Sequence, residues 1–519
     1  MAFDTELQTE TKPDELTPER PAPEAVSSGR LALILLAVAI TLFQAIEGLG
    51  PNTSWLLTVG DRWLDGALPY RDTLDTNPPI ALLVFLTSVY LSRLTGLTAE
   101  LVLITVVSAL CLAVIEWTVS TLSRSGGLTH PGRMRVTLGF ALLVLPMSGF
   151  ADPLHLAIIA AVPFWAVMWL NAEKRPVSRF TLVVGGICGG FLISINWLFL
   201  PAIILPALVL ARIERRFSGL FRPEFVIAGC FVLAYVAVLF FAFPAYFSII
   251  QPLLNDLYRP VREPIEVILT TQAIRWTVLA VFGLWLLART EPARPRIAMA
   301  LLTSLGFVFA VVDQAKSAPM QFYPMVASLV PALIFEGFDI ANRRIIRART
   351  ADRLIIVGGF LAIVTGLFFA SLSFFEYPSP ALTLADPITK LVKHPKVVAI
   401  TSDLSVGHPL VRRIGGSWIG SEPNAFPTLG ALYKLGLKPT EPPETARLVR
   451  VIVDDRARMA ADIARGKPDI IIVERDELIT QAWFADDQDL KAFLTGFHKS
   501  ATHVGDFELW VSDISRTLE

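Results

Sequence analysis

The sequence predicts an all-α polytopic membrane protein of about eleven transmembrane helices, followed by a small C-terminal α/β domain. Three observations predict this fold class. Hydrophobic residues make up 53% of the 519 residues and charged residues only 18%, whereas about a quarter of the residues in a soluble domain are charged. Apolar runs long enough to cross a bilayer recur between residues 31 and 374. After residue 375 these runs stop and charged residues return.

The composition also excludes some classes of protein. The formal net charge is −1, so nothing indicates nucleic acid as a partner. The three cysteines, Cys111, Cys188 and Cys230, lie inside apolar runs without metal-ligand spacing, which favours buried hydrophobic roles. Residues 1–29 are polar, rich in Pro and Glu, and lack a basic segment at their start. They predict a disordered cytoplasmic tail and not a cleavable signal peptide.

The apolar runs predict the spans, and the positive charges predict their orientation. We expect spans over Leu31–Leu49, Leu97–Leu122, Val136–Gly149, Leu154–Leu170, Phe180–Ile195, Leu198–Ala211, Phe225–Phe243, Leu269–Leu287, Ile297–Val312, Phe322–Phe338 and Leu354–Phe374. Lys and Arg collect in five loops, each separated from the next by two apolar segments, so all five can lie on the cytoplasmic side. The N-terminus is then cytoplasmic, and the C-terminal domain of residues 376–519 is periplasmic.

One apolar segment, Ile80–Leu94, is expected to lie along or dip into the outer interface. Its length of about 15 residues suits an interfacial helix better than a full crossing. If it crossed, the polar loop before it would be cytoplasmic and could not meet the loop around Asp152. We therefore expect juxtamembrane helices in a first outer loop of residues 50–96, within a transmembrane domain of residues 30–375.

The most unusual polar segment is Gly60–Pro79, GDRWLDGALPYRDTLDTNPP. Acidic residues gain nothing from anionic headgroups, so a cluster this dense beside a span needs another reason. A solvated loop with turn residues would have a similar composition. The alternative is an active-site loop that handles a polar substrate at the membrane face. Asp72 and Asp75, next to Asn77, are its candidate catalytic carboxylates.

Polar residues within or beside apolar runs are functional candidates, because exposing them to lipid costs free energy. Besides the first loop with its preceding residues 51–55, they occur in the turn FADPLHL (150–156), at Asn196, in residues 251–263 and in residues 313–323. All five places fall on the predicted outer face. Asp152 is a third candidate catalytic carboxylate, although capping a helix that starts at Pro153 would also explain it. The candidate substrate-binding residues are Asn52, Tyr70, Arg71, Asn77, His155, Asn196, Tyr258, Arg262, Gln314, Lys316 and Tyr323.

These places predict a shared outward cavity with carboxylates near one wall and cations near another. Lys316, with Arg259 or Arg262, could bind a phosphate, although a lysine that snorkels to the interface has the same pattern. A carboxylate could deprotonate a hydroxyl that attacks an anomeric carbon, and partial desolvation would raise its pKa toward that role. Such a cavity fits a lipid-phosphate donor and a hydroxyl acceptor.

Several short segments together resemble a known family. They are GALPYRD (66–72), DTNPP (75–79), NTSWLL (52–57), WLDG (63–66), FADPLHL (150–156), and Gln314-Ala315-Lys316 with Tyr323-Pro324. Over about residues 30–340 they resemble the GT-C class of membrane glycosyltransferases, of the protein mannosyltransferase and aminoarabinose transferase type. The resemblance implies a polyprenyl-phosphate-linked sugar donor, an envelope acceptor, and catalytic acidic residues in the first outer loop of a bacterial inner-membrane enzyme.

The sequence departs from the family pattern at several positions. Asn52 stands where the family has an aspartate, and an asparagine cannot act as a carboxylate base. Leu154 stands where the family has a glutamate, with Asp152 two residues earlier. The Trp and His that usually follow the lysine are missing. Either Asp152, Asp72 or Asp75 has taken over the role of the base, or this copy binds a sugar-lipid without turning it over; we expect an active enzyme.

The leading hypothesis is therefore a glycosyltransferase that moves a sugar from polyprenyl phosphate to a glycolipid, polysaccharide or protein. No P-loop or G-x-G-x-x-G motif follows a strand, which agrees with a lipid-linked donor. A transporter or flippase for a lipid-linked sugar is the alternative from another class, but the sequence lacks a convincing internal repeat. A third possibility is an inactive homologue that recruits envelope proteins. Without a clear Asp-x-Asp pair we expect no required cofactor and no metal ligands, although a divalent cation is possible.

The C-terminal residues alternate between strand and helix patterns and contain no catalytic motif. We expect strands at Val397–Ser402, Ile470–Val473 and Phe507–Val511, and helices at Thr445–Ala464 and Asp487–Phe497. The pairs Asp454-Asp455 and Asp486-Asp487 are expected on helix surfaces or caps and not in a metal site.

Overall fold

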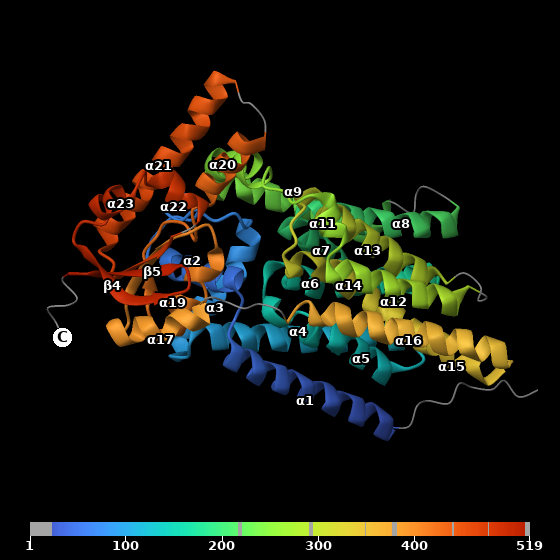
Figure 1. The fold of residues 1–519 in the computed structure, drawn as a ribbon. Helices are drawn as coiled ribbons and strands as arrows, with labels where there is room; N and C mark the ends of the chain where they lie inside the picture. Colours follow the sequence, from blue (N-terminus) through green and yellow to red (C-terminus); the bar gives the residue numbers. More distant parts are fainter. Residues whose placement is uncertain are drawn as a thin grey trace, which may run out of the picture.

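The computed structural model describes residues 23–215, 221–289, 294–347, 349–375, 381–437, 441–475 and 477–513. Long helices run side by side, and a smaller domain with a sheet lies at one end of them (Figure 1). The predicted tail of residues 1–29 lies mostly outside the described residues, and its last part belongs to the first helix. The helices of the first part are α1 (Pro23–Glu47), α2 (Pro51–Leu64), α3 (Pro79–Thr95), α4 (Ala99–Arg124), α5 (Pro131–Gly139), α6 (Pro153–Ala172), α7 (Arg179–Ile195), α8 (Leu200–Glu214), α9 (Pro223–Ala242), α10 (Gln251–Leu253), α11 (Ile265–Leu269), α12 (Gln272–Ala288), α13 (Pro295–Gln314), α14 (Tyr323–Val330), α15 (Gly337–Arg347) and α16 (Thr350–Leu372).

The chain is a multi-pass membrane protein. Among the described residues, eight helical stretches are long and apolar enough to cross a membrane, and α3, α7 and α12 are shorter apolar helices. The predicted span Val136–Gly149 corresponds to α5, which continues into a π-helical turn over Phe140–Val144. Helix α3 covers the segment expected to lie at the interface, and it packs against α2 and α4. The count of eleven spans stays a prediction.

Prolines and short polar residues define where the helices begin. A proline is the first residue of α2, α3, α5, α6, α9 and α13, a position where its missing N–H costs no hydrogen bond. Thr98 caps α4 and Ser178 caps α7, each through a side-chain oxygen that accepts a backbone N–H. These signals allow the starts of these helices to be predicted from the sequence.

Ion pairs gather at the end of the helices opposite the C-terminal domain, where Figure 1 places α15. Glu336 accepts hydrogen bonds from Arg294 at 2.8 Å and from Arg296 at 3.0 Å. Arg135, which is buried, binds Glu116 at 2.6 Å. Pairing lets these charges lie within the packed helices, because an unpaired buried charge costs several kcal/mol.

Helices α12 and α16 approach closely because glycines line their interface. A Cβ added at Gly366 would lie 2.5 Å from the carbonyl oxygen of Trp276 and 2.7 Å from the amide nitrogen of Ala280. In the same helix, a Cβ added at Gly358 would meet nothing within 4 Å. Small residues at such contacts let backbones pack in a membrane.

We expect Gly366→Val to destabilise the protein by about 1–3 kcal/mol, because the added atoms meet backbone that cannot move aside. Thermal unfolding in detergent measures this as a lowered Tm. Gly358→Val is the matched control, since it adds the same side chain to the same helix in open space. Equal Tm values for the two variants would show that the close helix contact is not formed.

The C-terminal domain is a five-stranded mixed sheet covered by helices. Its strands are β1 (Lys396–Ile400), β2 (Ser417–Trp418), β3 (Ile470–Glu474), β4 (Phe497–Val504) and β5 (Phe507–Ser512), and its helices are α17 (Ala381–Leu391), α18 (Leu404–Gly407), α19 (Leu410–Arg413), α20 (Phe426–Leu437), α21 (Pro442–Gly466), α22 (Leu478–Trp483) and α23 (Asp487–Phe493). The strand order is β2-β1-β3-β5-β4. Strand β1 pairs parallel to β2 and β3, whereas β5 pairs antiparallel to β3 and β4.

The three predicted strands are confirmed as β1, β3 and β5, and the predicted helix Thr445–Ala464 is confirmed as α21. The predicted helix Asp487–Phe497 ends earlier, at Phe493, because Phe497 begins the polar strand β4. Asp486 caps α23, as expected. Asp455 differs from the expectation of a surface or cap position: it is buried and accepts hydrogen bonds from Thr428.

Candidate active site

A cavity of about 610 Å³ lies where the membrane helices meet the C-terminal domain. All five predicted polar places contribute to its walls, together with part of α9 and residues 403–405 and 423–426 of the C-terminal domain. The predicted site residues that line it are Asn52, Asp75, Asn77, Asp152, Asn196, Tyr258 and Gln314. The cavity is therefore the candidate active site.

Two buried carboxylates in this cavity are joined by two side-chain amides. Asn77 Nδ2 donates to Asp75 Oδ1 at 3.1 Å and to Asn52 Oδ1 at 3.1 Å. Asn52 Nδ2 donates in turn to Asp152 Oδ2 at 2.8 Å. The order Asp75–Asn77–Asn52–Asp152 links the loop before α3, the start of α2 and the start of α6. We call these four residues the carboxylate–amide bridge.

Local structure places each member of the bridge. Asn52 lies in the first turn of α2, one residue after the proline that begins the helix. Asp152 is the N-cap of α6, where its Oδ1 accepts the N–H of Leu154 at 2.9 Å. Asp75 and Asn77 lie in the irregular segment before α3, and the Asn77 N–H donates to Asp75 Oδ2 at 3.2 Å. Asp152 is thus a helix cap, as the sequence allowed, and it lines the cavity as well.

Burial controls the charge of both carboxylates. Asp75 is 2% exposed, and loss of water raises its pKa to about 6, although hydrogen bonds from Asn77 and Trp55 act in the opposite direction. Burial also raises the pKa of Asp152, against hydrogen bonds from Asn52 and the Leu154 N–H. A carboxylate whose pKa lies near 6 can take up a proton close to neutral pH. Asp75 is therefore a candidate general base.

The remaining residues of the first loop lie outside the cavity lining. Asp72 is exposed, and its carboxylate accepts the N–H of Leu68 at 2.8 Å within the loop. Arg71 is also exposed. Tyr70 is buried, and its hydroxyl donates to the carbonyl oxygen of Asn77 at 2.8 Å. Tyr70 therefore supports the bridge through the backbone of Asn77, whereas Asp72 and Arg71 are exposed and do not line the cavity.

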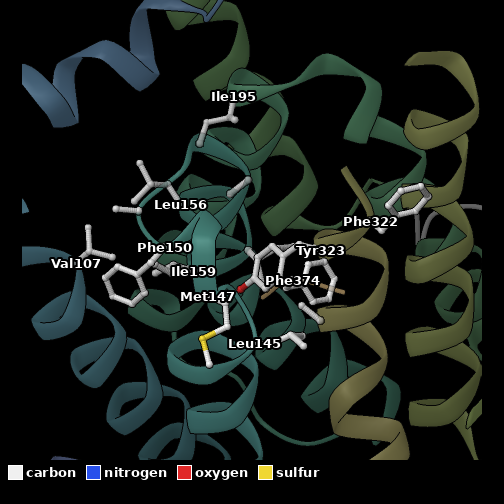
Figure 2. Packing of buried hydrophobic residues seen from close by; sticks show 14 of the residues in the cluster. Val107, Leu145, Met147, Phe150, Leu156, Ile159, Ile195, Phe322, Tyr323 and Phe374 are labelled. Carbon is white, nitrogen blue, oxygen red and sulfur yellow. The ribbon is translucent and has the colours of Figure 1, made fainter. Parts of the chain in front are cut away.

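His155 and Tyr323 are buried in the packing around the start of α6, where Figure 2 shows Tyr323 among apolar side chains. His155 Nδ1 lies 3.0 Å from the Ala151 amide nitrogen, and its Nε2 lies 2.8 Å from the carbonyl oxygen of Leu142. The Tyr323 hydroxyl donates to the carbonyl oxygen of Ala141 at 3.0 Å. Both side chains satisfy backbone groups, and neither lines the cavity.

Three cations lie near the cavity, but only one lines it. Arg259 lines the cavity, with its guanidinium 5.3 Å from the ring centroid of Trp197. Lys316 Nζ lies 3.1 Å from the ring centroid of Tyr258, so it borders the site through that ring. Arg262 does not line the cavity, and its guanidinium lies 3.8 Å from the Asp313 carboxylate. Arg259 is therefore better placed than Arg262 to meet an anionic group in the cavity.

The choice of site residues from the sequence missed two groups. Trp55 Nε1 donates to Asp75 Oδ1 at 3.0 Å; it lies three residues after Asn52 on α2, a spacing that places both side chains on one helix face. Asp403, Ser405 and Asn424 line the cavity from the C-terminal domain. No signal in the sequence joins them to the first loop, because more than 300 residues separate the two segments.

No family model matches the sequence, and no curated protein does. The structure is similar to that of ArnT from Cupriavidus metallidurans in the apo state, with a TM-score of 0.54, 13% identity, and coverage of 94% of this chain and 98% of that chain. A likeness to arabinofuranosyltransferase AftD from Mycobacteria has a TM-score of 0.42 and 14% identity and covers 93% of this chain and 41% of that one. The chain therefore shares the polytopic membrane fold of ArnT.

Proposed function

We propose that the protein is a glycosyltransferase that moves a sugar from a polyprenyl-phosphate donor to an envelope acceptor, a glycolipid, polysaccharide or protein. We place the reaction on the outer face of a bacterial inner membrane, with the N-terminus cytoplasmic and the C-terminal domain periplasmic. One observation carries the proposal: the carboxylate–amide bridge lies in a large cavity between membrane helices and a polar domain. The GT-C fold supports it.

The proposed reaction is a displacement at the anomeric carbon. Asp75 takes the proton of the acceptor hydroxyl as its oxygen forms a bond to the anomeric carbon. The bond between that carbon and the phosphate oxygen breaks, and polyprenyl phosphate leaves with the electron pair. Arg259 binds the phosphate and stabilises the charge that builds on it. Asp152 accepts a hydrogen bond from a hydroxyl of the sugar and thereby orients it.

The composition of the cavity walls suits these two substrates. Val232, Val236 and Leu239 of α9 and Phe247 after it give one side an apolar surface, which fits a prenyl chain. The C-terminal domain contributes the polar residues Asp403, Ser405 and Asn424 on another side. We place the acceptor there, because hydroxyl-rich substrates need hydrogen-bond partners in a buried site.

We expect no divalent cation to be required. Within the described ranges, no three His, Cys, Asp or Glu side chains are grouped so as to hold a metal ion. In the bridge, each carboxylate already accepts hydrogen bonds from neighbouring donors. Transfer should therefore continue in the presence of a chelator such as EDTA.

A transfer assay with purified protein in lipid vesicles tests the proposal. Labelled polyprenyl-phosphate sugars and an envelope lipid extract as acceptor should give a labelled product and free polyprenyl phosphate, whereas nucleotide sugars should give none. The double variant Asp75→Asn/Asp152→Asn is the matched control. Movement of the intact lipid-linked sugar across the vesicle membrane without cleavage would contradict the proposal and favour a flippase. Donor binding without turnover would also contradict it, in favour of an inactive homologue.

A further inference from the structure

The C-terminal domain touches the residue that donates to Asp75. The ring of His408, which follows α18, is fully buried. Its centroid lies 5.2 Å from the Trp55 ring of α2 and 4.9 Å from the Trp418 ring of β2. Neither nitrogen of His408 has a hydrogen-bond partner. The imidazole therefore contributes its shape at this position, where it packs between two indoles.

The contact bears on the carboxylate–amide bridge through a single hydrogen bond. Trp55 Nε1 donates to Asp75 Oδ1 at 3.0 Å, and this bond favours the ionised form of the carboxylate. An indole that lost its packing partner could rotate about its side-chain torsions and break the bond. The orientation of Trp55 therefore decides whether Asp75 keeps this donor.

Two further contacts join the same segment of the C-terminal domain to the first loop. The Leu74 N–H, in the residue before Asp75, donates to the carbonyl oxygen of Ser421 at 2.8 Å. Arg62 of α2 donates to the carbonyl oxygens of Trp418 and Gly420, both at 2.6 Å. Residues 418–421 thus bind the polypeptide at two points between Trp55 and Asp75. A polar domain far along the chain fixes the loop that carries the carboxylate.

We propose that His408 is a positioning residue, through which the C-terminal domain holds the Trp55 indole in hydrogen bond with Asp75. The inference rests on the proposed role of Asp75 as the base. It gives the C-terminal domain a part in the reaction that is separate from binding an acceptor. It also gives a role to a buried imidazole that has no hydrogen bonds.

The titratable and charged groups around Asp75 and His408 agree with a steric role for His408. Tyr70 and Tyr246 face Asp75, and Asp152 lies beyond the two amides of the bridge. Burial lowers the pKa of His408 to about 3, and the charges of Arg412 and Arg62, which face it, act in the same direction. His408 is therefore neutral across the working pH range, so its own titration cannot account for any change near pH 6.

The test compares three variants, His408→Ala, His408→Phe and Trp55→Phe, in the full-length protein. Phenylalanine keeps an aromatic ring of similar size and loses no hydrogen bond, whereas alanine removes the packing. Trp55→Phe removes the indole donor itself. The readouts are the acid limb of the kcat/KM profile and an infrared titration of the Asp75 carboxyl band, which Asp75→Asn identifies by its loss.

We expect the Asp75 titration to move upward by about one pH unit in His408→Ala and Trp55→Phe, since a hydrogen bond to a charged group is lost. His408→Phe should titrate like the wild type. The proposal is overturned if His408→Ala folds, as judged by its Tm, and titrates like the wild type, or if His408→Phe shifts as far as His408→Ala. The infrared arm does not depend on activity, so it decides about His408 even if Asp75→Asn keeps full transfer and the proposed base is wrong.

Discussion

Asp75→Asn is expected to lower kcat for sugar transfer by about 10²–10⁴-fold, the range that a general base contributes. An asparagine cannot accept the proton of the acceptor hydroxyl. Its side-chain oxygen can still accept the two hydrogen bonds that Asp75 Oδ1 accepts from Trp55 and the Asn77 side chain, whereas the Asn77 N–H loses its acceptor at Oδ2. Most of the contacts that shape the loop should therefore remain. The loss should therefore appear in kcat, with a smaller change in KM. Transfer of a labelled sugar from a polyprenyl-phosphate donor measures it.

Asp72→Asn is the matched control for this variant. Asp72 lies three residues earlier in the same loop, but it is exposed, and its carboxylate accepts the Leu68 N–H. An asparagine oxygen can take over that bond, so kcat should stay within about twofold of the wild type, since surface substitutions have small effects. A large loss in Asp72→Asn with an active Asp75→Asn would assign the base to Asp72 and contradict the placement of the site.

The pH dependence follows from the raised pKa of Asp75. Only the ionised carboxylate can accept a proton, so kcat/KM should rise with pH through about 6. Stability changes in the opposite direction. The folded pKa lies above the ordinary value of 3.8, so folding favours the protonated form, and the stability this provides is lost as pH rises from about 4 through 6. As the pH rises through this interval, the Tm of Asp75→Asn should therefore fall less than the Tm of the wild type.

Much of the fold could be predicted because its signals are local. Apolar runs locate the membrane helices, and prolines or capping residues mark where many of them begin. Strands β1, β3 and β5 each contain a run of apolar residues, so the sequence predicts them too. Strand β2 has only two residues and β4 has a polar sequence, so neither has a pattern that separates it from a loop or a helix end.

The site could be predicted in part, because polar residues beside membrane spans need a reason to be there. This argument found Asp75, Asn77, Asn52 and Asp152, which form the bridge. It could not separate Asp75 from Asp72, because the direction of a side chain in an irregular loop depends on backbone turns. Tyr70, for example, has a φ of 68°. This left-handed conformation is uncommon for a tyrosine and could not be predicted from the sequence.

Contacts between segments that are distant in the chain could not be predicted from the sequence. The pairing of Arg262 with Asp313 turns one predicted cation away from the cavity, and the ring of Tyr258 meets Lys316. The C-terminal domain supplies part of the cavity wall and the ring that packs on Trp55. These relations depend on how the packed domains meet, and no periodicity or spacing in one segment encodes them.

Asn52 is the position where the sequence departs most from the resembling family, and the structure gives its amide two functions. Its oxygen accepts a hydrogen bond from Asn77, and its nitrogen donates one to Asp152. An amide can do both, whereas an ionised carboxylate has no hydrogen to donate. The hydrogen bond from the asparagine thus favours the ionised form of Asp152, against the burial that raises its pKa.

Asn52→Asp is therefore expected to lower activity at neutral pH and not to improve it. The new carboxylate would replace a donor that lies 2.8 Å from Asp152 Oδ2. Two carboxylates at that distance share one proton, and one of their pKa values rises strongly. We expect the acid limb of kcat/KM to move upward by about two pH units, so that activity near pH 7 falls by about tenfold or more and partly returns at higher pH.

Asn52→Leu separates this electrostatic effect from simple loss of the bridge. It removes both hydrogen bonds without adding a charge, so it should lower kcat about 10- to 100-fold, because Asp152 and Asn77 each lose a partner and the reacting geometry loosens. The acid limb should then move much less than in Asn52→Asp. If Asn52→Asp instead exceeds the wild type at every pH, the restored acid is the better base, and the amide at this position is a loss of function that Asp75 and Asp152 only partly offset.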